Sequence, residues 1–245
     1  MKTRLLILTC FTLGNLYSDS FTYKSISFIQ LDAIASSILT EPGKPATTYA
    51  PFKVFDGNFK SAWCSDNKKE TENPFIEVKI KPSPANGIMI LNGIANSVTI
   101  YKKNNRIKDY ELFVYDEKGD EQKISGKLKD NSCGSSIGRA NPETYCQEYT
   151  DFKNDAKKVK ECIKTYREEC VIDSHQEGGG GEKIKFKKPI CLTKFKLVIK
   201  SVYPGKEFND TCISELFPIV TDTIYGLYEV EDPTLNEIFK NCPIP

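Results

Sequence analysis

Alternation of apolar and charged residues along short segments is the feature that most constrains this fold. Ile76, Val78 and Ile80 alternate with charged residues, and the same period of two recurs over 110–115, 183–187 and 194–200. This period is typical of half-buried antiparallel strands. The Asp-Glu-Lys-Gly run at 116–119 predicts a hairpin turn between strands at 109–115 and 121–128, and the apolar run 87–94 predicts a buried strand. The sequence therefore predicts an all-β fold with the architecture of a β-sandwich.

Composition excludes several classes of function. A chain of 245 residues is long enough for one large domain or two small ones. With 39% apolar and 27% charged residues, its composition is ordinary for a globular protein. Lys and Arg (34) balance Asp and Glu (33), which argues against a nucleic-acid partner. His175 is the sole histidine, so His-rich metal sites and most His-based catalysis are not expected.

The N-terminus has the pattern of a secretory signal peptide at 1–18. Lys2 and Arg4 precede a short apolar run, and small residues follow near Ser18. The run is too short to span a bilayer, and no later segment reaches the length of a transmembrane helix. A first core strand and lipoprotein anchoring at Cys10 are the alternatives. We expect an exported protein that is periplasmic, on the cell surface or secreted.

The cysteines also favour export. Loss of Cys10 with the signal peptide leaves eight, an even number that allows up to four disulfides. None of them forms the close CxxC pairs of a zinc site. The sequence leaves open how six of them pair: Cys133, Cys146, Cys162, Cys170, Cys191 and Cys242.

One segment has helical periodicity instead. Apolar residues recur at helical spacing from Asp151 to Cys170, which predicts an amphipathic helix. Cys162 and Cys170 would lie about 12 Å apart along it, beyond disulfide reach, so each is expected to pair elsewhere. We therefore divide the chain into a signal peptide and a sandwich interrupted by a helical, Cys-rich insertion with a Gly-rich exit. The predicted segments are 1–18, 19–130 (first part of the sandwich), 131–181 (insertion), 182–221 (second part) and 222–245 (C-terminal extension).

Four local patterns occur in a diagnostic order. They are Ala-Ser-Ser at 35–37, the run from Val54 to Cys64 with Asp-Gly-Asn and Ala-Trp-Cys, Asn-Gly at 92–93 followed by 104–108, and Tyr-Pro-Gly at 203–205 followed by Asp-Thr-Cys-Ile-Ser-Glu at 210–215. Together they resemble the discoidin-like, galactose-binding jelly-roll superfamily, most closely the bacterial NADase-type glycan-binding or translocation domain. The resemblance covers about 30 to 220 without 131–181. It implies a jelly-roll β-sandwich that binds sugars on a loop-built rim, often with a structural calcium, and it does not imply NAD cleavage.

The resemblance also implies a metal site and a disulfide. Calcium takes six to eight oxygen ligands. The residues that match the family pattern are Asp56 and Glu215, with backbone or hydroxyl oxygens near Asn58 and Ser61; an ordinary turn beside an edge carboxylate is the alternative. The loops that carry Cys64 and Cys212 are neighbours in similar domains, which predicts a Cys64–Cys212 disulfide. Trp63 is predicted to be core.

Sugar recognition needs an exposed ring for the C–H face and fixed donors and acceptors for hydroxyls. Residues of this kind in the predicted rim loops are Asn92, Asn96, Tyr101, Asn105, Arg106, Tyr203 and Asp210. Each could also serve a structural role in a turn or a salt bridge.

These observations predict an exported, non-enzymatic module that binds glycans through its rim loops. A protein-binding adhesin on the same scaffold, with the insertion as its contact surface, is the alternative. A secreted hydrolase would need a nucleophile with a base, or two working carboxylates, and the sequence offers no such set.

Overall fold

The computed structural model describes residues 31–69, 72–130, 142–148, 154–168, 181–219 and Cys242. The predicted signal peptide with Cys10, the cysteines Cys133 and Cys170, and His175 lie outside these residues, as does the C-terminal extension apart from Cys242. The elements follow one another as β1 (Leu31–Ala35), the 3-10 helix η1 (Pro51–Phe55), β2 (Trp63–Cys64), β3 (Phe75–Asn92), α2 (Val98–Lys103), β4 (Arg106–Ile107), β5 (Asp109–Asp116), β6 (Glu121–Lys127), α3 (Pro142–Glu148), α4 (Ala156–Glu168), β7 (Glu182–Ile199), β8 (Val202–Tyr203) and β9 (Cys212–Ile219).

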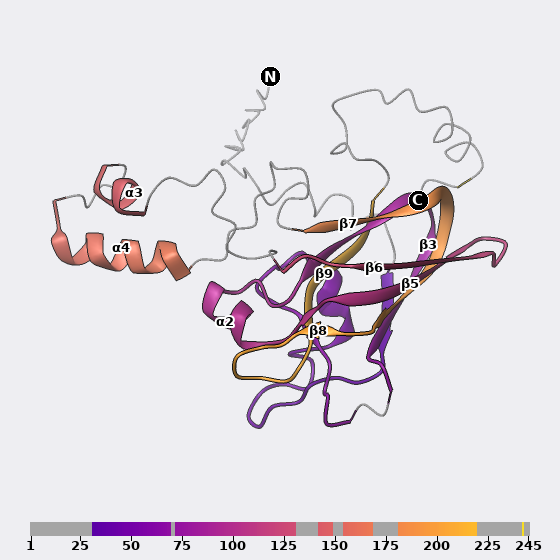
Figure 1. The fold of residues 1–245 in the computed structure, drawn as a ribbon, viewed down its shortest axis with the longest axis horizontal. Helices are drawn as coiled ribbons and strands as arrows, with labels where there is room; N and C mark the ends of the chain where they lie inside the picture. The colour runs from indigo at the N-terminus through magenta and orange to yellow at the C-terminus, as the bar shows by residue number, and fades with distance from the viewer. Residues whose placement is uncertain are drawn as a thin grey trace, which may run out of the picture.

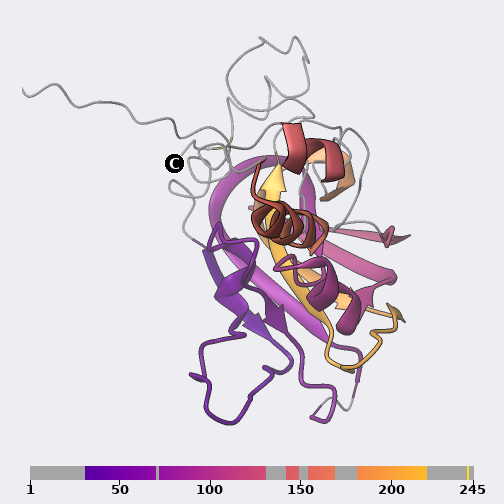
Figure 2. The same ribbon diagram turned by 90° about the vertical axis from the view of Figure 1, so that its left-hand side faces the viewer.

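The architecture is an antiparallel β-sandwich built from one continuous ladder of strands. The strand order is β2-β9-β3-β7-β5-β6, with β1 also paired to β3, and β4 and β8 form a separate two-stranded sheet. One edge of β3 pairs with β1 over 76–80 and with β9 over 87–92, while its other edge pairs with β7. Because β3 and β7 bend, each contributes to both layers (Figures 1 and 2).

The bends correct one expectation. Separate strands were predicted at 76–80 and 87–94, and again at 183–187 and 194–200; each pair is instead a single 18-residue strand. The β3–β7 register shifts between Lys79 and Ser83 and between Ala85 and Gly87. A bulge of this kind interrupts the alternation of side chains without ending the pairing, and Pro82, Pro84 and Pro189 hide the continuity in the sequence.

The main core lies between the layers and contains the inward-facing residues of β3, β5, β7 and β9. Trp63 is fully buried within it, as predicted, and its Nε1 donates to the Ser37 carbonyl at 3.0 Å. The predicted hairpin is also confirmed, because β5 and β6 pair from Asp109 to Lys127 around a turn in which Gly119 has a φ of 83°.

Two helices, α3 and α4, lie between β6 and β7 in the sequence and stand side by side away from the sheets (Figure 1). α4 begins at Ala156 rather than at Asp151, because the Asp155 carboxylate accepts from the backbone N–H groups of Lys157 and Lys158 and so caps the first turn. Cys162 pairs with Cys146, not with Cys170. Within the described part of the chain, no helix has the length and apolarity to cross a membrane.

Candidate functional site

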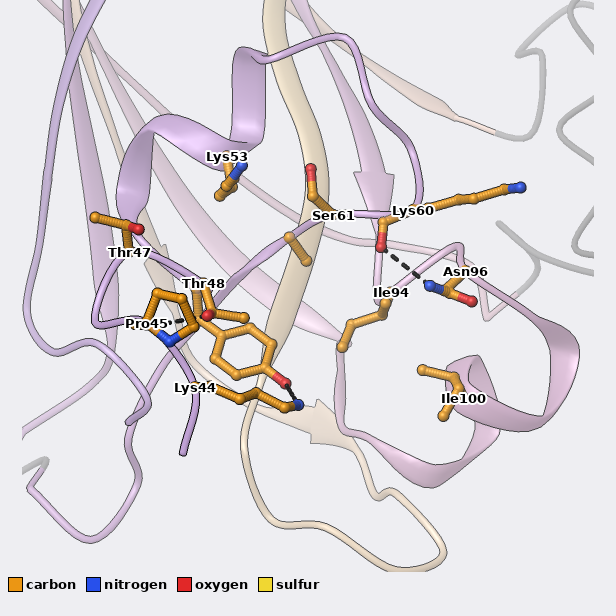
Figure 3. A pocket seen from close by; sticks show the side chains of 12 residues that line it. Lys44, Pro45, Thr47, Thr48, Lys53, Lys60, Ser61, Ile94, Asn96 and Ile100 are labelled. Atoms are coloured by element: carbon orange, nitrogen blue, oxygen red, sulfur yellow. Dashed lines mark hydrogen bonds between the residues drawn. The ribbon is translucent and has the colours of Figure 1, made fainter. Parts of the chain in front are cut away.

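A pocket of about 600 Å³ opens at one end of the sandwich, and we call it the rim pocket. It is formed by the loop before η1, by η1, by the loop leading into β2 and by the loop leading into α2 (Figure 3). Its lining residues are Lys44, Pro45, Thr47, Thr48, Tyr49, Lys53, Lys60, Ser61, Ala62, Ile94, Asn96 and Ile100.

The apolar wall of the pocket is part of a second, smaller core. Ala62 and Ile94 pack with the half-cystines Cys64 and Cys212, and Tyr49, Leu39 and Ile100 pack against them. The Cys64–Cys212 disulfide, with a Cα–Cα distance of 4.1 Å, confirms the predicted pairing. The pocket wall is therefore anchored to a covalent link between residues 148 apart in sequence.

Polar groups at one side of the pocket form a short chain. The Lys44 ammonium donates to the Tyr49 hydroxyl at 2.9 Å, and that hydroxyl donates to Glu41 at 3.0 Å. Lys44 also pairs directly with Glu41. The hydrogen bond from Lys44 lowers the pKa of Glu41, whereas burial raises the pKa of Tyr49. Contacts within the protein therefore position the Lys44 ammonium and the Tyr49 hydroxyl at this side of the pocket.

The other side of the pocket is held by β9. Its buried Ser214 donates to the Phe59 carbonyl at 3.0 Å and accepts from the Ala95 N–H at 2.9 Å. One side chain thus ties together the loops that carry Lys60 and Asn96. The Asn96 amide donates to the Lys60 carbonyl at 3.4 Å (Figure 3).

The Asp-Gly-Asn turn lies beside the pocket, between the lining residues Lys53 and Lys60 in the sequence. Asp56 accepts from the Asn58 N–H at 2.9 Å, from the Ser61 hydroxyl at 2.8 Å and from the Lys53 ammonium at 3.0 Å. Gly57 has a φ of 72°, a backbone conformation that glycine adopts without strain. The turn is therefore closed by its own side chains, and Ser61 and Lys53 belong both to it and to the pocket lining.

Glu215 lies behind this turn and has no such partners. Its side chain is fully buried, and neither carboxylate oxygen has a hydrogen-bond partner. Burial, followed by repulsion from Asp56, raises its pKa to about 8, although the nearby Gly57 N–H lowers it in part. A buried carboxylate without a partner is costly unless it is protonated or bound to a cation. Asp56 and Glu215, with oxygens near Asn58 and Ser61, have the hard-oxygen chemistry that suits calcium.

Comparison with known proteins identifies the family. The family model for the NAD glycohydrolase translocation F5/8 type C domain matches residues 22–218. The chain belongs to this discoidin-like family. No curated protein matches the sequence. The description of the matched model is that of a translocation domain.

Solved structures that align with most of this chain are distant in sequence. They include the family 32 carbohydrate-binding module of Streptococcus pneumoniae EndoD (13% identity, 78% of this chain and 96% of that chain, TM-score 0.43). A second is CBM32-3 of a family 31 glycoside hydrolase from Clostridium perfringens (12%, 79% and 96%, 0.42). A third is an F5/8 type C domain from Bacteroides fragilis (10%, 77% and 89%, 0.42).

Within this family fold, one of the seven residues predicted to bind sugar, Asn96, lines the rim pocket. Asn92 is buried and exchanges two hydrogen bonds with the backbone of Ile107, at 2.7 and 2.8 Å. Asn105 is buried as well: it accepts from the Gly205 N–H at 2.6 Å and donates to the Asn209 carbonyl at 2.9 Å. Both asparagines hold the loops of the rim together.

Arg106 and Tyr101 belong to a second structure on the rim, the Arg106 cluster of Tyr101, Asn104, Arg106 and Asp130. Arg106 binds both oxygens of Asp130, at 2.9 and 2.7 Å, and donates to the Asn104 carbonyl at 2.7 Å. The Tyr101 hydroxyl donates to Asp130 at 3.0 Å, and its ring lies 5.2 Å from the guanidinium. Gly93 fits here because an added Cβ would lie 2.7 Å from the Tyr101 ring.

The two remaining predicted residues are engaged with the protein as well. The Tyr203 hydroxyl donates to the Leu128 carbonyl at 2.9 Å. The Asp210 carboxyl lies 3.1 Å from Cys212 Sγ, and burial raises its pKa. The prediction did not include Lys44, Tyr49, Lys60, Ile94 and Ile100 as binding residues. Lys44 and Tyr49 lie in a loop whose main signal is Pro-Gly-Lys-Pro at 42–45, Lys60 and Ile94 lie in or beside motifs that were interpreted in other ways, and Ile100 lies in α2.

Proposed function

We propose that this chain is an exported, non-catalytic domain that binds carbohydrate in the rim pocket. The observation that carries the proposal is the pocket lining itself. Ile94, Ile100 and the Tyr49 ring offer apolar surface for the C–H face of a sugar, and hydroxyl, amide and ammonium groups surround that surface. Membership in a family of translocation domains supports a non-catalytic role. The disulfides Cys64–Cys212, Cys146–Cys162 and Cys191–Cys242 support export, because disulfides persist in oxidising compartments.

Glycan-array binding by the full, oxidised chain tests this function. We expect signal on a related set of sugars that Tyr49→Ala and Asn96→Ala each reduce. Lys118→Ala is the matched control, because Lys118 is exposed in the β5–β6 turn, away from the pocket. Signal that survives both pocket variants would contradict the placement of the site. Absence of signal from a folded, multivalently displayed chain would contradict carbohydrate binding.

We also propose that a calcium ion stabilises the rim behind the pocket. The Asp56 and Glu215 carboxylates would hold it, with oxygens near Asn58 and Ser61. The ion would neutralise two carboxylates and fix the turn that carries Ser61. Calorimetric titration with calcium tests this, and we expect binding to be lost in Glu215→Gln, which keeps the shape of the side chain. Heat of binding that persists in this variant would contradict the site.

A protein ligand is the second candidate, and one feature favours it. The disulfide-linked helices α3 and α4 stand away from the sheets, and the Tyr145 ring, which is 39% exposed, lies 4.8 Å from the Tyr166 ring. Exposed aromatic side chains are enriched in protein interfaces. Tyr145→Ala would weaken binding to a protein partner and leave the glycan array unchanged.

A further inference from the structure

The charges that line the rim pocket are of one sign. Lys44, Lys53 and Lys60 line it, and its twelve lining residues include no aspartate or glutamate. The chain as a whole has almost equal numbers of basic and acidic residues, 34 and 33. The charged groups of the lining are therefore all cations, and the carboxylates that pair with two of them lie outside the lining.

The three lysines differ in how far they are already neutralised. Lys44 pairs with Glu41, and Lys53 pairs with Asp56 at 3.0 Å. Lys60 is exposed, and no carboxylate of the described residues lies within ion-pair distance of its ammonium. It is the lysine of the pocket whose charge remains available to a ligand.

The positions of these groups suit a sugar with one charged substituent. The Lys60 side chain extends outward past Asn96 on one side of the pocket, while Lys44 and Tyr49 lie together on the other side (Figure 3). The apolar wall formed by Ile94 and Ile100 lies between the two groups. A sugar ring packed on this wall would place substituents toward both ends.

We propose that the rim pocket selects acidic glycans, with Lys60 pairing to a sugar carboxylate while Lys44 and Tyr49 engage hydroxyls at the opposite side. This proposal rests on the proposed carbohydrate-binding function and names its ligand class. The ligand is a uronate or another carboxylated sugar residue. Because the pair forms at an exposed position, it supplies selectivity more than affinity.

The test compares each acidic sugar with its own methyl ester, which removes the charge and adds one methyl group. Galacturonate, glucuronate and N-acetylneuraminate are titrated into the full, oxidised chain at low salt, with ligand-observed NMR as the readout. We expect one of the acids to bind about three to ten times more tightly than its ester. The ratio is expected to shrink in high salt, where exposed charges are screened.

Two variants locate the effect. Lys60→Gln is expected to bring the ratio of acid to ester affinity close to one, while Lys118→Gln leaves it unchanged. Both lysines are exposed, so both variants fold. An acid preference that persists in Lys60→Gln would overturn the role of Lys60.

The failures of the two proposals are distinguishable. Equal binding of acid and ester, or binding confined to neutral sugars on the glycan array, would overturn the acidic ligand class and leave carbohydrate binding intact. Absence of binding to every sugar on the array would overturn carbohydrate binding itself.

Discussion

The two halves of the rim contain similar residues and use them in different ways. In the Arg106 cluster, the Asp130 carboxylate accepts three hydrogen bonds from Arg106 and Tyr101. Behind the rim pocket, the Glu215 carboxylate is fully buried and accepts none. The polar groups of the first half bond to one another and to the backbone, and so they hold loops together. The second half has a buried carboxylate without a hydrogen-bond partner and an open pocket, and both are features of ligand-binding sites.

The largest expected effect concerns Glu215 in the absence of calcium. Its pKa is raised to about 8 in the folded chain, from 4.5, so the unfolded chain releases this proton at lower pH than the folded chain. The free energy of unfolding should therefore fall as the pH rises from about 4.5 to about 8, by about 5 kcal/mol, and then level off. Urea unfolding at a series of pH values, with a calcium chelator present, measures this.

The Glu215→Gln variant provides the control. It should remove this fall and make the chain more stable than the unsubstituted protein at pH 8. Added calcium should flatten the slope of the unsubstituted protein and leave the variant unaffected. A slope that is identical in the two proteins would show that Glu215 is satisfied in the folded state, as Asp130 is.

The next largest effect is expected on the other half of the rim. Arg106→Ala should destabilise the fold by about 3 kcal/mol, because it leaves Asp130 without its main partner and removes buried contacts with Tyr101. Chemical denaturation measures the loss of stability. Arg106→Lys should lose less, because lysine keeps the charge but cannot bind both Asp130 oxygens in the way that arginine does. Weaker glycan binding by folded Arg106→Ala, at unchanged stability, would mean that this half of the rim binds ligand after all.

A smaller effect is expected for Tyr101→Phe. The variant keeps the ring beside Arg106 and Gly93 and loses the hydrogen bond of 3.0 Å to Asp130. We expect a loss of about 1 kcal/mol in the free energy of unfolding and no change in glycan binding. If binding falls while stability holds, the hydroxyl serves a ligand and not Asp130.

The smallest effect on stability is expected in the pocket. Lys60→Gln should leave the thermal midpoint unchanged, since the Lys60 ammonium pairs with no carboxylate of the described residues. Differential scanning fluorimetry beside the unsubstituted chain checks this. A drop in the midpoint would place Lys60 with the structural residues of the rim and weaken the contrast between the two halves.

Local patterns predicted those parts of the fold that depend on neighbours in sequence. The alternation at Tyr110, Leu112 and Val114 predicted their burial, and the Asp-Glu-Lys-Gly run predicted the turn. The long strands were divided wrongly because a bulge near Ser83 breaks the alternation while pairing with β7 continues. That pairing depends on a strand about a hundred residues away, which no local pattern contains.

At the candidate site, the sequence identified residue types but not which of them are engaged by the protein itself. The ordered motifs led to the family, to the Cys64–Cys212 disulfide and to Asn96, but they also singled out Arg106 and Asn92, which the structure shows bonded to the protein. A polar residue in a loop looks the same in sequence whether its partner is a ligand or a distant backbone group.

Local patterns predicted most strand segments, the family and the residue types present at the rim, because periodicity and motif order are local properties of the chain. The continuity of the long strands, and which of the polar residues already have hydrogen-bond partners, depend on contacts between distant parts of the chain. Asp130 meets Arg106 across 24 residues, whereas Ser214 joins loops 119 and 155 residues away. Glu215 has the Gly57 N–H nearby but no donor in hydrogen-bonding geometry, because the strands β3 and β9 bury it beside η1. Contacts between residues far apart in the sequence therefore decide whether a polar group has a partner within the protein. The half of the rim whose polar groups have such partners is structural, and the half with an unpaired carboxylate and a pocket is the one that we propose binds a ligand.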